Sequence, residues 1–145
     1  MKIKFDHINL TVGNLDEGIT WYESIFGFKF VEGGVSQEGK RWAIVAYDDY
    51  MICMTEYSDR KKADAVGDSD AHQLYHFGIR VSDVNEWQDK VNRLNLQLHY
   101  GGVVEYPNSK SWYVHDPSGH EIEVSYSDGK SLQFPDHENV KNYAT

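Results

Sequence analysis

The sequence predicts an α+β protein built from two tandem β-α-β-β-β modules. Residues 6–15 (DHINLTVGNL) resemble residues 75–84 (YHFGIRVSDV), since each segment has a histidine followed by apolar residues at +1, +3 and +5. Residues 52–55 (ICMT) likewise resemble residues 122–125 (IEVS). The two histidines are 69 residues apart, and the centres of the second pair of segments are 70 residues apart. Two distant pairs with nearly the same separation indicate a duplicated module.

The first module is expected to begin with a strand and continue with a helix. Apolar and polar residues alternate from His7 to Val12, as they do in a strand with one buried face. Asn14 and Glu17 have the spacing of a capping box that begins a helix, and Gly27 can end the helix in the left-handed conformation. The apolar stripe of this helix consists of Leu15, Ile19, Tyr22 and Ile25.

The second module repeats this order. Its first strand follows His76, and Asp83 with Glu86 can begin the helix. Asn95 can end the helix, because asparagine tolerates the left-handed conformation. The apolar stripe consists of Val84, Trp87, Val91 and Leu94.

Each helix is followed by strands, of which the last two are the clearest. Residues 41–47 and 50–57 are expected to pair in the first module, and residues 110–115 and 120–126 in the second. The second pair is joined by Asp116-Pro117-Ser118-Gly119, which has proline and glycine where a tight turn favours them. The segment between each helix and its strand pair has a less clear pattern.

The 145 residues suit one domain with a simple internal division. Module one is expected at about residues 1–58 and module two at about residues 73–127. Residues 59–72 are polar and are interpreted as a linker. Residues 128–145 carry no clear period and are interpreted as a C-terminal tail.

Composition and charge exclude several kinds of partner. The net charge of −9 disfavours binding to a phosphate backbone, so we expect no nucleic-acid partner. No apolar stretch approaches the roughly 20 residues of a membrane-spanning helix, and the first residues do not resemble a signal peptide. The single cysteine, Cys53, excludes a disulfide within the chain. We therefore expect a cytoplasmic protein without a membrane partner.

Three side chains with metal-binding chemistry fall on one face of the predicted strands. Strand alternation puts His7, His76 and Glu123 on the face opposite the helices, together with Cys53. If the two modules form a curved mixed sheet, this face lines a common cavity. Two imidazoles and one carboxylate form a set that binds Mn, Ni, Fe(II) or Zn and leaves positions open for a substrate. The sequence thus predicts a curved mixed sheet around a metal-binding cavity.

Each of these residues also has a simpler interpretation. A single histidine such as His7 is more often structural than a ligand, and Cys53 is more often a small buried apolar residue than a nucleophile. The repeat-related positions of the two histidines favour the metal site.

The combined pattern resembles the vicinal-oxygen-chelate superfamily. The resemblance rests on the paired modules, the histidine at the start of each module and a final D-P-x-G-H-x-x-E motif, here Asp116 to Glu123, and it covers residues 3–127. It implies one divalent metal ion, a small-molecule substrate whose two neighbouring oxygens chelate that ion, and often a homodimer. Its members include glyoxalases, fosfomycin-resistance and bleomycin-resistance proteins, and extradiol dioxygenases. Most of the extradiol dioxygenases need a chain about twice as long as this one.

Two subfamilies resemble the chain in different ways. Glyoxalase I is similar in His7, His76 and Glu123, but has a glutamate where this chain has Cys53. Fosfomycin-resistance enzymes are similar in a Ser-x-Tyr before the final motif, here Ser111 and Tyr113. The resemblance makes these two residues candidate substrate contacts, with Cys53 and two further candidates, Asn9 and Arg80.

The sequence therefore favours a divalent-metal-dependent enzyme of the glyoxalase or fosfomycin-resistance type. Three reactions stay open: isomerisation, thiol addition with a thiol cosubstrate, and epoxide opening. The enzyme would accordingly be a lyase, an isomerase or a thiol transferase. The alternative is a non-catalytic protein of the bleomycin-resistance type, which sequesters a small molecule or antibiotic without a metal. No catalytic residue is assigned beyond the proposed ligands.

Overall fold

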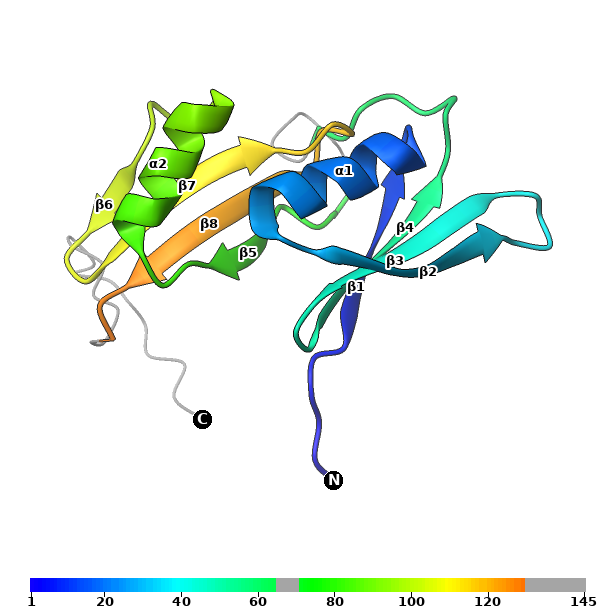
Figure 1. Ribbon diagram of the computed structural model, residues 1–145, viewed down its shortest axis with the longest axis horizontal. Coiled ribbons are helices and arrows are strands. Elements are labelled where there is room, and N and C mark those ends of the chain that lie inside the picture. The colour runs from blue at the N-terminus through cyan, green and yellow to red at the C-terminus, as the bar shows by residue number, and fades with distance from the viewer. Residues whose placement is uncertain (65–70, 130–145) are drawn as a thin grey trace. The chain divides into compact units, whose positions relative to one another are not determined.

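The computed structural model describes residues 1–64 and 71–129 and confirms the two tandem modules (Figure 1). The first module contains β1 (His7–Val12), α1 (Leu15–Phe26), β2 (Lys29–Val35), β3 (Arg41–Tyr47) and β4 (Tyr50–Glu56). The second contains β5 (Phe77–Arg80), α2 (Val84–Leu94), β6 (Val104–Tyr106), β7 (Ser109–His115) and β8 (Glu121–Ser127). Part of the predicted linker, residues 65–70, and most of the predicted tail, residues 130–145, lie outside the described residues. Within the described ranges, no helix has the length and apolar character needed to cross a membrane.

Both modules have the same sheet topology. The first sheet has the strand order β1-β4-β3-β2 and the second has the order β5-β8-β7-β6. The first strand of each module pairs in parallel with the last, whereas the β2–β3, β3–β4 and β6–β7 pairs are antiparallel. These mixed sheets, each with one helix, confirm the α+β class (Figure 1).

The strand register agrees with the sequence repeat. Asn9 is paired with Cys53 in the first sheet, and Gly78 is paired with Glu123 in the second. Asn9 lies two residues after His7, and Gly78 lies two residues after His76. Cys53 therefore has the position in the first sheet that Glu123 has in the second.

The helices begin and end at the predicted capping residues. The Asn14 side chain accepts a hydrogen bond from the backbone N–H of Glu17 at 2.9 Å, and Asp83 caps α2 in the same way. Gly27 and Asn95 end the helices with φ of 78° and 49°, in the left-handed region that these residue types tolerate. Local sequence thus fixes both helices.

The first core lies between α1 and one face of its sheet. The helix contacts β2, β3 and β4, and Tyr22 is fully buried. The other buried apolar side chains of this core are Leu10, Val12, Leu15, Ile25, Phe28, Ala43, Val45, Ile52 and Met54. Burying this face leaves His7, Asn9 and Cys53 on the opposite one, as strand alternation predicts.

The second core is centred on two tryptophans. Trp87 of α2 and Trp112 of β7 are almost completely buried, and their rings meet at 6.5 Å and 67°. The other buried apolar side chains are Val91, Val114, Ile122 and Val124. Since Ile122 and Val124 point into this core, Glu123 between them points to the opposite face.

The compact units of the structure differ from a simple division into modules. Among the described residues, those up to Tyr75 group with His115–Glu121, and His76–Val114 group with those between Ile122 and Gly129. The turn between β7 and β8 therefore belongs to the first unit. Its Ser118 carbonyl accepts a hydrogen bond from the backbone N–H of Ala63 at 2.7 Å. Gly119 has φ of 88°, and a Cβ there would lie 2.5 Å from the Ala63 carbonyl oxygen, so the turn requires glycine.

Asp116 is the centre of this turn. Its buried carboxylate accepts hydrogen bonds from the Tyr22 hydroxyl at 2.9 Å and from the backbone N–H groups of Ser118 and His120. The His120 ring nitrogen Nδ1 lies 2.8 Å from the same carboxylate. Burial, and after it the charge of Asp116, raises the pKa of Tyr22 well above its ordinary value, so the phenol remains a donor. The first half of the D-P-x-G-H-x-x-E motif is thus explained by structure alone.

Candidate functional site

In the second unit, His76 and Glu123 are in direct contact. Nε2 of His76 lies 2.9 Å from Oε2 of Glu123. His76 directly precedes β5, and Glu123 lies on β8, which pairs in parallel with β5. The side chains are 28% and 25% exposed, so the pair is partly buried and still reachable from solvent. This contact brings together two of the three predicted ligands.

Ser111 fixes the carboxylate of this pair. It is buried on β7, next to β8, and its hydroxyl donates a hydrogen bond to Oε1 of Glu123 at 2.6 Å. One carboxylate oxygen is therefore held by Ser111 while the other faces His76. The residue predicted as a substrate contact is thus engaged with the predicted ligand Glu123.

Tyr113 and Arg80 lie in the same unit. The ring of Tyr113, two residues after Ser111 on β7, meets the ring of His76 edge-on at 5.7 Å. Arg80 is exposed at the end of β5, where it is paired with Ser125. The structure therefore brings Tyr113 to the His76–Glu123 pair. Arg80 lies further along β5, the strand that pairs with β8 of Glu123.

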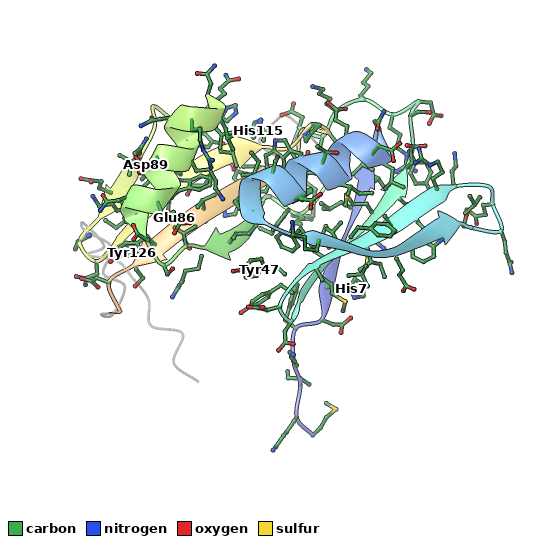
Figure 2. The ribbon with its side chains drawn as sticks, in the orientation of Figure 1. His7, Tyr47, Glu86, Asp89, His115 and Tyr126 are labelled. Atoms are coloured by element: carbon green, nitrogen blue, oxygen red, sulfur yellow. The ribbon has the colours of Figure 1, made fainter. Side chains whose placement is uncertain are left out.

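In the first unit, His7 lies at the beginning of β1 (Figure 2). Its Nδ1 is 2.6 Å from the carboxylate of Asp6, and its side chain is 44% exposed. A hydrogen bond from Nδ1–H to a carboxylate places the lone pair of the neutral imidazole on Nε2. Asp6, which sequence analysis did not single out, thus orients the His7 ring through Nδ1.

Cys53 and Asn9 share the open face of the first sheet with His7. They are register partners on β4 and β1, and Cys53 is half-buried with a free thiol. Burial, and after it the negative charge of Asp6, raises the pKa of Cys53 above its ordinary value. The thiol is therefore protonated at neutral pH and is a poor nucleophile.

The raised pKa of Cys53 predicts slow alkylation. At pH 7.5 iodoacetamide is expected to modify Cys53 more slowly than free cysteine, and the pH midpoint of the alkylation rate is expected to lie above the ordinary thiol pKa of about 8.5. The pH dependence of the rate, followed by mass spectrometry, checks this. Asp6→Asn removes the repelling charge and should lower the midpoint. A midpoint at or below that of free cysteine would show that the thiol is activated.

Taken singly, neither unit gathers three His, Cys, Asp or Glu side chains into a metal-binding group within the described residues. The second unit supplies an imidazole and a carboxylate in contact, and the first supplies an imidazole held by a carboxylate. Sequence analysis also missed Tyr100, whose ring contacts that of Tyr113. The sequence offers only a weak indication of Tyr100, which is an aromatic residue directly before Gly101-Gly102, a pair that indicates a tight turn.

Comparison with known proteins identifies relatives over most of the chain. The sequence profile of the Glyoxalase/Bleomycin resistance protein/Dioxygenase superfamily matches residues 4–124. A lactoylglutathione lyase of Neisseria meningitidis is 25% identical over 123 residues, which cover 81% of this chain and 86% of that protein.

Two solved structures share the fold. A glyoxylase/bleomycin resistance protein/dioxygenase domain from Frankia sp. EAN1pec superposes with a TM-score of 0.72 at 17% identity, covering 90% of this chain and 96% of that one. The fosfomycin resistance protein FosX from Listeria monocytogenes, complexed with Mn(II) and sulfate, superposes with a TM-score of 0.64 at 16% identity, covering 88% and 94%.

Proposed function

The chain belongs to the Glyoxalase/Bleomycin resistance protein/Dioxygenase superfamily, and on this basis we propose that it is a metal-dependent enzyme. Its substrate is a small molecule with two neighbouring oxygens, and its ligands for one divalent ion are His7, His76 and Glu123. The observation that carries the proposal is the contact of His76 with Glu123 at 2.9 Å, with Ser111 holding the second carboxylate oxygen.

The donor set fits a divalent transition metal. Imidazole nitrogen and carboxylate oxygen are ligands of Mn, Fe(II), Ni and Zn, and such groups bind metal in their deprotonated forms. Each of the three is partly exposed, which leaves access for the ion. When bound, the ion supplies a Lewis acid that polarises substrate oxygens.

Residues that are not proposed ligands help to orient the ligand side chains. Ser111 restricts rotation of the Glu123 carboxylate, and Asp6 restricts the tautomer of His7. In the first unit, Cys53 occupies the position equivalent to Glu123, and its protonated thiol is a poor general base. Proton transfer by a fourth, carboxylate ligand at this position is therefore not supported.

Charge favours some substrates over others. A phosphonate requires several cationic groups, but Lys110 of the second unit is ion-paired with Glu105 at 2.7 Å. Among the described residues that we proposed as substrate contacts, Arg80 is the one cation. This arrangement supports isomerisation of, or thiol addition to, a weakly charged substrate more than phosphonate epoxide opening.

Asp6→Asn is expected to weaken metal binding about tenfold, because an amide no longer holds His7 as a carboxylate does. The dissociation constant, measured by competition with a chromophoric chelator, checks this. Asp59→Asn, at an exposed position, is the matched control and should leave the constant unchanged. Equal affinities for the wild type and Asp6→Asn would exclude the positioning role of Asp6.

The function is tested by assaying the protein loaded with Mn, Ni, Fe(II) or Zn for three reactions: isomerisation of a thiohemiacetal, thiol addition to an epoxide and epoxide hydration. We expect one reaction to be accelerated, and the acceleration to disappear with chelator and in Glu123→Ala. If no metal-dependent turnover is found but a cationic drug binds tightly to metal-free protein, the enzyme proposal is wrong and the sequestering alternative is supported.

A further inference from the structure

An aromatic cluster adjoins the His76–Glu123 pair within the second unit. The Tyr113 ring meets the His76 ring edge-on, and the Tyr100 ring meets the Tyr113 ring at 5.0 Å and 89°. The His99 ring follows at 6.4 Å from that of Tyr100. A continuous row of rings therefore begins at one proposed ligand and extends away from it.

The backbone holds Tyr100 in an unfavourable conformation. Its φ is 56°, and Gly101 and Gly102 follow with φ of 80° and 107°. Glycine adopts such angles freely, but a bulky residue does so at an energetic cost, which is common at ligand-binding sites. The loop is closed by hydrogen bonds from the His99 N–H to the Tyr113 carbonyl and from the Gly102 N–H to the His99 carbonyl.

Core packing does not explain this conformation. Tyr100 is 55% exposed, whereas the tryptophans of the second core are almost completely buried. A tyrosine that is held against Tyr113 and still presents half its surface to solvent provides an apolar ring face beside a polar pair. Strand alternation puts Lys110 of β7 on the opposite face from Tyr113, and the lysine is ion-paired with Glu105 at 2.7 Å, so it does not supply a free positive charge beside the rings.

We propose that Tyr100 and Tyr113 form an aromatic wall that selects substrates with a planar aromatic group next to their two neighbouring oxygens. The oxygens bind at the proposed ligands, so this part rests on the proposed function. The ring binds against the two tyrosines, and this part rests on the geometry of the loop from His99 to Gly102.

The test compares mandelate with lactate, which share a hydroxyl next to a carboxylate and differ in a phenyl in place of a methyl group. Isothermal titration calorimetry of the zinc-loaded protein is expected to show that mandelate binds about fivefold more tightly than lactate. Tyr100→Gly, which suits the left-handed backbone and removes the ring, should abolish this preference, whereas Tyr100→Phe should keep it. Tyr50→Ala, at an exposed tyrosine of the first unit, is the control.

Equal binding of the two acids by the wild type, binding of neither, or a preference that persists in Tyr100→Gly would each overturn the aromatic wall. Metal content, measured separately, distinguishes this failure from that of the proposed function. Bound zinc without a preference for mandelate refutes the wall alone. A Tyr100-dependent preference in protein that binds no metal supports the wall and refutes the metal site.

Discussion

Replacing Glu123 with alanine is expected to lower metal affinity by more than about 100-fold, because the variant loses a ligand rather than a residue that supports one. The loss of metal affinity is expected without unfolding of the protein. Glu123 is partly exposed and lies outside the tryptophan core, but the buried Ser111 hydroxyl loses its acceptor, which costs about 1 to 3 kcal/mol of stability. Glu123→Gln keeps an acceptor for Ser111 and removes the charge, so it should lose metal affinity with less change in stability.

The measurement is a metal titration of each variant beside its urea-unfolding curve. Glu105→Ala is the matched control, since Glu105 is an exposed glutamate of the same unit whose ion pair with Lys110 adds little stability. Full occupancy and unchanged affinity in both Glu123 variants would exclude Glu123 as a ligand.

Asp116→Ala is expected to destabilise the protein by about 3 to 5 kcal/mol. The side chain is 1% exposed and accepts hydrogen bonds from Tyr22 and from two backbone N–H groups of its own turn. Removing the carboxylate leaves the fully buried Tyr22 hydroxyl and the turn without their acceptor. The midpoint of urea unfolding should fall while the slope of the transition stays unchanged.

Asp59→Ala, at an exposed turn position, should change stability by less than about 0.5 kcal/mol. Tyr22→Phe removes one donor and keeps the ring, so it should cause a smaller loss than Asp116→Ala. A loss below about 1 kcal/mol in Asp116→Ala would show that other groups satisfy the turn and that this explanation of the motif is wrong.

The elements with a strong local signal were predictable from sequence. Both helices begin directly after their capping residues, Asn14 and Asp83, as expected, because a capping side chain acts on the N–H groups of the next turn. The strand at residues 41–47 has its predicted bounds because one face is buried and its residues alternate. By contrast, β2 is exposed at every position and its register shifts between Phe30 and Glu32, so it carries no alternating pattern. The strand β6 has three residues, which is too short for any period.

The candidate site was predictable only in part, for a similar reason. Strand alternation puts Glu123 on the open face, and its contact with His76 follows from the parallel pairing of their strands. The expected pairing of β7 with β8 puts Ser111 and Glu123 on adjoining strands, but their hydrogen bond at 2.6 Å also depends on strand register and side-chain orientation, which the sequence pattern does not give. The position of Tyr100 depends on a left-handed backbone and a ring contact, neither of which leaves a periodic trace. The ligand set of His7, His76 and Glu123 stays a prediction.

The most direct measurement is elemental analysis of the untagged protein after incubation with Mn, Ni, Fe(II) or Zn, with His7→Ala as the comparison. His7 belongs to a different compact unit from His76 and Glu123, so its contribution tests whether the three residues act as one ligand set. We predict about one divalent ion per chain in the wild type and loss of that ion in the variant. No bound ion with any of the four metals, or full occupancy in His7→Ala, would contradict the proposed metal site.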